Sequence, residues 1–156
     1  MHHRERDVAR AIIVSPDSRI FLVKIVLGER SFWITPGGGM KDQEDTQTAL
    51  VRELKEEIGR ENWEIGPVVW TRSHRFDFEG ETLTQHEKFH WVPSEMFKPP
   101  PEMPDAHENQ YFGEFRWWTA QEIAASREDF APRKLAKYFK EILNVGLPRS
   151  PIDVGI

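Results

Sequence analysis

The chain lacks several features that would place it in familiar classes of protein. It contains no cysteine, which excludes a disulfide framework and is compatible with a reducing compartment. It has no apolar run long enough for a membrane helix and no signal-peptide pattern, so we expect a cytoplasmic protein that contacts no membrane. Positive charge is in deficit, because 21 Lys and Arg face 26 Asp and Glu. The resulting net charge of −5 argues against polymeric nucleic acid as the main partner.

What the chain has is material for one folded domain. Its 156 residues are 38% hydrophobic, which is enough to bury a sizeable core. No internal repeat, low-complexity block or linker divides it. We therefore expect a single domain over residues 1–156, and no pattern indicates an oligomeric state.

The most informative segment is residues 36–60, which read PGGGMKDQEDTQTALVRELKEEIGR. Within an expected helix, Glu53, Glu56 and Glu57 fall inside an arc of roughly 100°. Like charges this close repel one another, so a cation between them would be stabilising. Mg²⁺ is commonly held by one or two carboxylates together with substrate phosphates. The alternative is a solvated acidic face that nearby basic residues balance.

The apolar residues of this helix bear on that choice. Leu50, Leu54 and Ile58 form the stripe that should pack on a core. Glu57 falls beside Leu50 at the edge of the stripe, whereas Glu56 lies furthest from it. Glu57 should therefore be the most desolvated of the three glutamates. A carboxylate at the rim of a core is costly unless it is paired or bound to a metal, which counts against the solvated face and leaves both interpretations open.

The segment also has recognisable boundaries. Asp45 or Thr46 suits the helix N-cap, and Gly59 suits a left-handed residue at the C-terminus. Upstream, residues 32–34 form an aromatic and β-branched run that is typical of a strand. A strand, a glycine turn, a loop and an acidic helix therefore follow one another.

Three consecutive glycines form the turn, namely Gly37, Gly38 and Gly39. Glycine allows backbone N–H groups to approach phosphate oxygens closely, so we predict a phosphate-binding turn. The spacing fits neither a P-loop nor a dinucleotide-binding fingerprint. A plain tight turn is the alternative.

Taken together, these spacings resemble the Nudix hydrolase family. The family's box reads Gly, five residues, Glu, seven residues, Arg-Glu, an apolar residue, one residue, Glu-Glu, one residue, Gly and an apolar residue. The chain carries Gly38, Glu44, Arg52, Glu53, Leu54, Glu56, Glu57 and Gly59 at these positions. It departs at Arg60, where the family usually has an aliphatic residue, and this puts the packing at the helix end in question.

The resemblance implies a Nudix-type α/β/α sandwich with a mixed β-sheet between helices. It also implies hydrolysis, dependent on Mg²⁺ or Mn²⁺, of a pyrophosphate bond in a nucleoside diphosphate linked to another moiety, so the partner would be a small-molecule nucleotide derivative. Metal ions suit this reaction because they neutralise the phosphate oxygens that repel a nucleophile. The implied metal ligands are Glu53, Glu56 and Glu57. The implied catalytic set is Glu53 with Arg52, which orients the carboxylates, and Glu44, which bridges the loop to the metal shell.

The general base is not assigned by this resemblance. Outside the box the candidate acids are Glu87, Asp105, Glu108 and Glu114, each of which is otherwise a surface residue. Glu108 belongs to the proline-rich segment 93–109, which is either a lid over the site or a passive surface excursion. Histidines that could contact phosphate, or simply hold structure, are His74, His86, His90 and His107.

The rest of the chain reads as further strands and helices. Strands are expected over residues 8–14, 20–27, 68–78, 82–92 and 111–117. Thr119 should cap a short helix, and a second substantial helix should follow Pro132 and end at Gly146. We expect an irregular tail over residues 146–156.

The substrate is the least determined property. Aromatic residues could stack on a base, but on strands they are more often core residues. The chain lacks the downstream signatures that mark the ADP-ribose, dinucleoside-polyphosphate and NADH branches of the family, and this favours a nucleoside triphosphate or an unassigned nucleotide derivative. A catalytically inactive Nudix-fold nucleotide-binding or regulatory module is the alternative, and the intact acidic triad argues against it.

Overall fold

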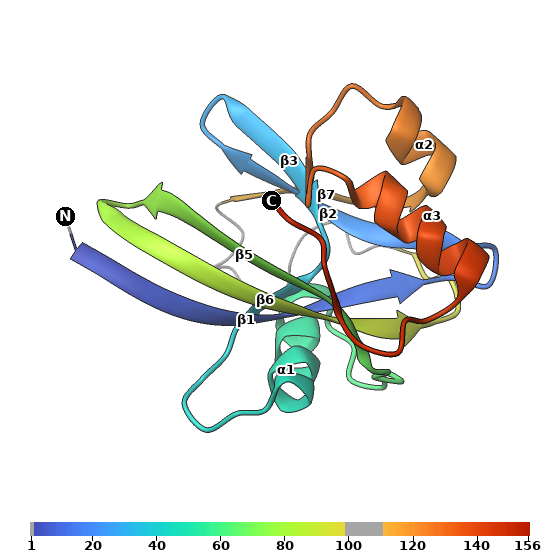
Figure 1. Cartoon of the computed structure of the whole chain (residues 1–156), viewed down its shortest axis with the longest axis horizontal. Coiled ribbons are helices and arrows are strands. Elements are labelled where there is room, and N and C mark those ends of the chain that lie inside the picture. The colour runs from blue at the N-terminus through green and yellow to red at the C-terminus, as the bar shows by residue number, and fades with distance from the viewer. Residues whose placement is uncertain (1, 99–110) are drawn as a thin grey trace.

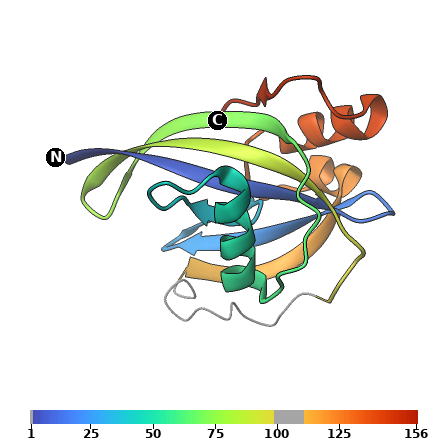
Figure 2. The ribbon, with the colours of Figure 1, turned by 90° about the horizontal axis from the view of Figure 1, so that it is seen from below.

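The computed structural model describes residues 2–98 and 111–156, and its centre is a curled mixed sheet (Figure 1). The strands are β1 (His2–Val14), β2 (Arg19–Leu27), β3 (Arg30–Ile34), β4 (Gly37–Gly39), β5 (Val68–Phe78), β6 (Glu81–Pro93), β7 (Phe112–Thr119), β8 (Phe130–Ala131) and β9 (Ile152–Asp153). The helices are α1 (Thr46–Ile58), α2 (Ala120–Ala125) and α3 (Leu135–Val145). Helix α1 covers one face of the sheet, and α2 and α3 lie on the other side (Figures 1 and 2). The predicted α/β/α sandwich is confirmed.

The sheet order is β8-β3-β2-β1-β6-β5-β9, with β4 beside β1 and β7 beside β2. Strand β1 runs parallel to β6 along its whole length, from the His2–Glu81 pair to the Val14–Pro93 pair. Against β2 it pairs only at Val14 and Ile20, after which the two strands diverge. Strand β4 fills part of the opening by pairing with β1. The glycine turn, as β4, thus pairs with the part of β1 that β2 does not pair with.

Two cores lie on the two faces of this sheet, and β1 contributes to both. Ala9, Ala11 and Ile13 belong to the core under α1, whereas Ile12 and Val14 belong to the core under α3. This alternation follows the two-residue period of a strand. The position of Arg10 between them places its side chain on the face opposite α1.

Helix α1 has the ends that the sequence predicts. The Asp45 side chain accepts a hydrogen bond from the Thr48 N–H at 2.7 Å, so Asp45 is the N-cap. Gly59 adopts a φ of 83° and its N–H bonds to the Lys55 carbonyl, which closes the helix. Leu50 and Leu54 are fully buried. The apolar stripe therefore fixes which side of α1 faces the sheet.

The β5–β6 hairpin also follows its prediction. Glu79 and Gly80 both have positive φ, as a two-residue turn requires when it matches the twist of the strands. Two other expectations are corrected. Strand β1 starts at His2, well before residue 8, and the tail contains β9, which pairs with β5 and is followed by the buried Val154.

Most of the predicted lid or excursion over residues 93–109 lies outside the described residues. Its described part is anchored, because the Phe97 ring packs 4.9 Å from Phe21 and 5.7 Å from Trp63. Across residues 2–98 and 111–156, every helix is too short or too polar to cross a membrane.

Candidate active site

The glycine turn and helix α1 meet through two glutamates. The Gly37 N–H donates to Glu57 Oε2 at 3.1 Å, and Glu57 is only 5% exposed. Glu53 is equally buried and its carboxylate lies against Gly38. The sequence predicts Glu57 to be the most desolvated of the three glutamates, and this is only partly correct: the Glu56 side chain is far more exposed, but Glu53 is as buried as Glu57.

The approach between the turn and its neighbours requires glycine. A Cβ added to Gly38 would lie 2.8 Å from Glu53 Oε1 and nearer still to Oε2. A Cβ added to Gly37, whose φ is 145°, would collide with the carbonyl oxygen of Ala9. The triple glycine is therefore a place where backbone and carboxylates come close together, with Gly37 and Gly38 buried and Gly39 partly exposed.

Arg52 ties the helix, the loop and the turn together. Its Nε and Nη2 each donate to the Glu44 carboxylate at 2.8 Å, and Nη2 also bonds to the Gly39 carbonyl at 3.0 Å. Its Nη1 donates to Glu53 Oε1 at 2.8 Å, while the Glu56 carboxylate is 3.6 Å away. A guanidinium suits this role because its donors point in fixed, different directions.

These bonds set the protonation of the network. Hydrogen bonds from Arg52 and from the Lys41 N–H lower the pKa of Glu44 to about 2. The same bonds to Glu44 raise the pKa of Arg52. Glu44 and Arg52 are therefore both charged near neutral pH.

The residues suit a divalent cation by their chemistry. Carboxylate oxygens are the ligands that Mg²⁺ and Mn²⁺ prefer, and Glu53 and Glu57 reach adjacent glycines of the turn. In the parts of the chain that the structure describes, three acidic or histidine side chains do not converge into a closed metal cluster. Mg²⁺ does not need one, because it usually combines one or two carboxylates with waters and substrate phosphates.

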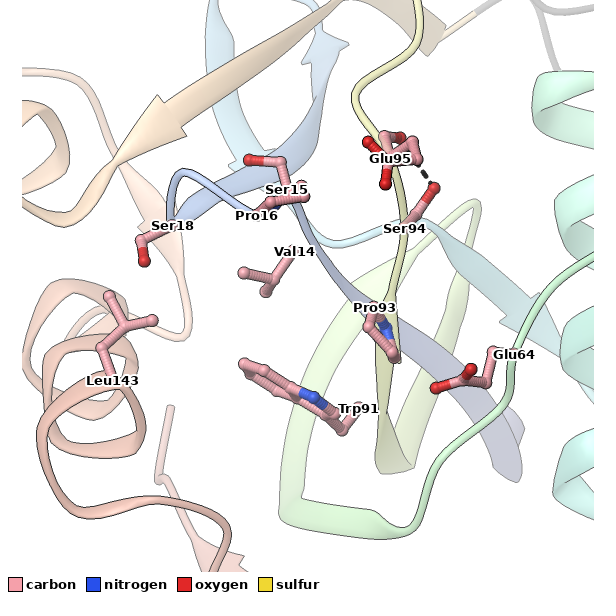
Figure 3. Close-up of a pocket in the computed structure, with 10 residues that line it drawn as sticks. All are labelled: Val14, Ser15, Pro16, Ser18, Glu64, Trp91, Pro93, Ser94, Glu95 and Leu143. Atoms are coloured by element: carbon pink, nitrogen blue, oxygen red, sulfur yellow. Dashed lines mark hydrogen bonds between the residues drawn. The ribbon is translucent and has the colours of Figure 1, made fainter.

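A hollow of about 600 Å³ adjoins the turn. It is bounded by the loop from Gly39 to Glu44 and by residues 4–7 of β1. A second hollow, of about 410 Å³, lies at the other end of β1, between Val14, Trp91 and Leu143, with Glu64 and Glu95 at its rim (Figure 3). It contains none of the predicted site residues, so the hollow beside the turn is the one that adjoins the candidate chemistry.

The candidate acids outside the box have other surroundings. Glu87 is 3% exposed and accepts hydrogen bonds from Arg10 Nε at 2.6 Å and from Arg72 Nη1. Burial alone would raise the pKa of Glu87, but the two arginines outweigh it and lower the pKa. A carboxylate held in this way is a weak base. Glu114 is exposed on β7, and Asp105 and Glu108 lie outside the described residues.

The described histidines divide in the same way. His90 is held between the Gly66 carbonyl and the Thr46 hydroxyl, each at 2.8 Å, which is a structural role. His86 bonds to Ser73 on the neighbouring strand. His74 contacts the Glu87 group, and His107 lies outside the described residues.

Sequence reasoning missed Arg10 and Arg72, whose only signal is an arginine inside an otherwise apolar or β-rich run. It also left the packing at Arg60 open. The Arg60 guanidinium lies 4.4 Å from the Trp63 ring and bonds to the Ser94 hydroxyl at 3.1 Å. A cation–π contact thus replaces the aliphatic contact at the helix end.

Three of the aromatic residues on the strands are core residues, as the sequence favours. Trp33, Trp70 and Trp118 are at most 1% exposed and belong to the core under α3. They are therefore not available as open platforms for a nucleobase.

Comparisons with known proteins agree with this geometry. The NUDIX domain model matches residues 4–139. The RNA pyrophosphohydrolase of Pelagibacter ubique (strain HTCC1062) is 35% identical over 54 residues, which are 35% of this chain and 34% of that protein. The 8-oxo-dGTP diphosphatase of Proteus vulgaris is 34% identical over 61 residues, 38% of this chain and 54% of that protein. The matches thus span a third to a half of these relatives.

Solved structures share the fold over nearly the whole chain. The E. coli ORF135 protein superposes with a TM-score of 0.63 at 26% identity, covering 95% of this chain and 96% of that one. The MutT protein from Methanosarcina mazei Go1 gives 0.62 at 16% identity, covering 90% and 96%. The second likeness concerns the fold alone.

Proposed function

The chain belongs to the NUDIX domain family, and from that premise we propose that it hydrolyses a pyrophosphate bond in a nucleotide derivative, with Mg²⁺ or Mn²⁺ as its cofactor. The observation that carries the proposal is the meeting of Glu53 and Glu57 with Gly37 and Gly38 at the opening of the sheet. Carboxylates held against a glycine turn that adjoins a hollow are what a metal-dependent reaction on phosphates needs.

The acidic residues of the box and the glycine turn have proposed roles. Glu53 and Glu57 are metal ligands, with Glu56 as a third. The bound metal would neutralise phosphate oxygens and help to activate water. Gly37, Gly38 and Gly39 let the phosphates approach the backbone.

Arg52 and Glu44 act on the position of Glu53. Arg52 holds Glu53 Oε1 at 2.8 Å, and the two bonds from Arg52 to Glu44 fix the guanidinium against the loop. The carboxylate therefore reaches the turn already oriented, so little reorganisation is needed when substrate binds.

The proposed substrate is a nucleoside triphosphate. The missing signatures of other branches support this choice, and so does the likeness to an 8-oxo-dGTP diphosphatase. The likeness to an RNA pyrophosphohydrolase makes RNA the outcome to test against it, and the net charge of −5 favours the small nucleotide.

A panel of nucleoside triphosphates, nucleoside diphosphate derivatives and a 5′-triphosphorylated RNA oligonucleotide tests the proposal. Each is incubated with the chain and Mg²⁺ or Mn²⁺, and the products are identified. We expect a nucleoside triphosphate to yield a monophosphate and pyrophosphate. Tight binding without any product would favour a binding or regulatory module instead.

A substitution of Glu57 tests its proposed role as a metal ligand. Glu57→Gln should lower turnover by at least 100-fold while the far-ultraviolet circular dichroism is kept. Glu61→Gln is the matched control, because Glu61 is an exposed glutamate just beyond the same helix, paired with Lys55 at 2.6 Å. Unchanged turnover in Glu57→Gln would refute the role of this residue.

A further inference from the structure

A second charged cluster lies on the sheet face opposite α1, built from β1, β5 and β6. Arg72 pairs with Glu87 across β5 and β6, and Glu87 pairs with Val8 of β1. Arg10 follows Val8 on the same face of β1, and His74 follows Arg72 on the same face of β5. The proposed catalytic set uses none of these four polar side chains, so their burial needs a separate explanation.

The cluster holds more positive than negative charge. Glu87 binds Arg10 with one carboxylate oxygen and Arg72 with the other. Burial, followed by the neighbouring Arg72, lowers the pKa of His74 to about 4, so the ring is neutral near pH 7. Two guanidiniums and one carboxylate leave one positive charge in a region where only 2% of the Glu87 side chain and 7% of the Arg72 side chain are exposed. A buried charge without a counter-charge is costly, and an anion would remove that cost.

The cluster also contains buried side-chain nitrogens that make no hydrogen bond within the described residues. These are Arg72 Nε and His74 Nε2, although Glu87 Oε1 lies 3.6 Å from His74 Nε2. The His74 ring is held by stacking on Phe76, with 4.9 Å between centroids. The side chains of Arg10 and His74 remain 12% and 17% exposed, which leaves a way in from solvent. The unpaired Nε–H of Arg72, in a partly open basic cluster, suits an oxyanion.

The position of Arg10 links the cluster to the glycine turn. Arg10 pairs with Gly37 across β1 and β4, and its Nη1 donates to the Thr35 carbonyl at 3.3 Å. The N–H of the same Gly37 binds Glu57. The cluster and the proposed catalytic turn are therefore joined through the pairing of β1 with β4.

We propose that Arg10 and Arg72, oriented by Glu87, bind phosphate oxygens on the face of the sheet opposite α1. The inference rests on the proposed function in one respect, namely that the phosphate belongs to the nucleotide being cleaved. It adds residues outside the Nudix box that select this substrate. The competing explanation is that the ion pairs only tie β1, β5 and β6 together.

Binding without turnover separates these explanations. The whole chain is kept in EDTA, and its affinity for inorganic phosphate is measured by calorimetry and by the shift in melting temperature. Arg72→Met removes the excess charge and should weaken phosphate binding by about tenfold. Glu87→Gln raises the cluster to two positive charges, so it should bind phosphate at least threefold more tightly and gain more in melting temperature than the unmodified chain. A structural tie alone does not predict opposite signs.

Arg75→Met is the matched control, because Arg75 is an exposed arginine on the same strand with its side chain on the other face. It should leave phosphate affinity unchanged. Equal affinities in all four proteins would overturn the proposal, as would an equal loss in Arg75→Met. If Arg72→Met does not fold, Arg72→Lys and Glu87→Gln provide the comparison, and tighter binding by Glu87→Gln still decides it.

Nucleotides identify the source of the phosphate. A nucleoside monophosphate should bind more tightly than inorganic phosphate in EDTA, and the unphosphorylated nucleoside should bind far more weakly. Binding of inorganic phosphate alone would overturn the link to substrate. If the Mg²⁺ panel gives no product while the opposite effects of Arg72→Met and Glu87→Gln persist, the proposed hydrolysis fails and the phosphate site stands.

Discussion

Gly38→Ala should disable the site without removing any of its charges. The new Cβ would lie 2.8 Å from Glu53 Oε1, whereas ordinary contact begins at roughly 3.5 Å, so the carboxylate must retreat by at least about 0.7 Å. Displacements near 1 Å lower rates by up to about 10²-fold. We therefore expect turnover to fall between about 10- and 100-fold, which is about 1.4 to 2.7 kcal/mol of activation free energy.

Folding should survive this change. The φ of Gly38 is not in the left-handed region, so alanine fits the backbone, and replacing glycine stabilises by about 0.4–1 kcal/mol through the unfolded chain. The clash is with the end of a flexible side chain, so the net change in unfolding free energy should stay within about 1 kcal/mol.

The assay is initial rate against Mg²⁺ concentration, with denaturant unfolding of the same samples. Gly113→Ala serves as the control, because Gly113 lies on β7, away from the turn. Its new Cβ would lie 3.0 Å from the Val26 side chain on β2. Turnover of Gly38→Ala within twofold of the unmodified chain, with unchanged dependence on Mg²⁺, would refute the role given to the Glu53 carboxylate.

Three further outcomes are expected. Arg52→Lys should reduce turnover by about 10- to 100-fold, because a single ammonium cannot bond in the directions of the guanidinium, and equal rates would contradict this. Asp45→Ala should lower the denaturation free energy by about 1 kcal/mol through the lost bond from Thr48, measured in urea with turnover as the control. His74→Gln should flatten the pH dependence of the unfolding free energy. In the unmodified chain the folded-state pKa of His74 is about 4, below the ordinary 6.5, so folding favours the neutral ring. The stability that His74 contributes is therefore complete above pH 6.5 and is lost as the pH falls towards 4. At pH 5 the loss in the unmodified chain should be on the order of 1–2 kcal/mol, and parallel pH profiles would contradict it.

The sequence predicts well those features that depend on residues close together in the chain. Helix α1, its cap at Asp45 and its end at Gly59 depend on spacings within one segment, and the structure confirms them. The spacing also places the box carboxylates on α1 beside the glycine turn. The hairpin at Glu79 and Gly80 is similarly local.

Contacts between residues far apart in the chain could not be predicted. Arg10, Arg72 and Glu87 come together only because β1 pairs in parallel with β6, and no local pattern encodes that register. The sequence presents Glu87 as a surface acid or a base, but its environment is set by residues 15 and 77 positions away. Arg60 is a substitution whose contact with Trp63 needs the folded loop.

The parallel ladder between β1 and β6 also has a consequence for how the chain is synthesised. His2 pairs with Glu81, which lies 79 residues further along the chain, and every other pair in the ladder has the same separation. At about 5–20 residues per second, the ribosome needs on the order of 4–16 seconds to supply the second strand. During that interval the residues of the glycine turn and the acidic helix have already been synthesised, but β1, which pairs with the turn, still lacks β6. The hydrolytic centre should therefore assemble late, and a chain stalled before residue 81 should expose the edge of β1 to other chains.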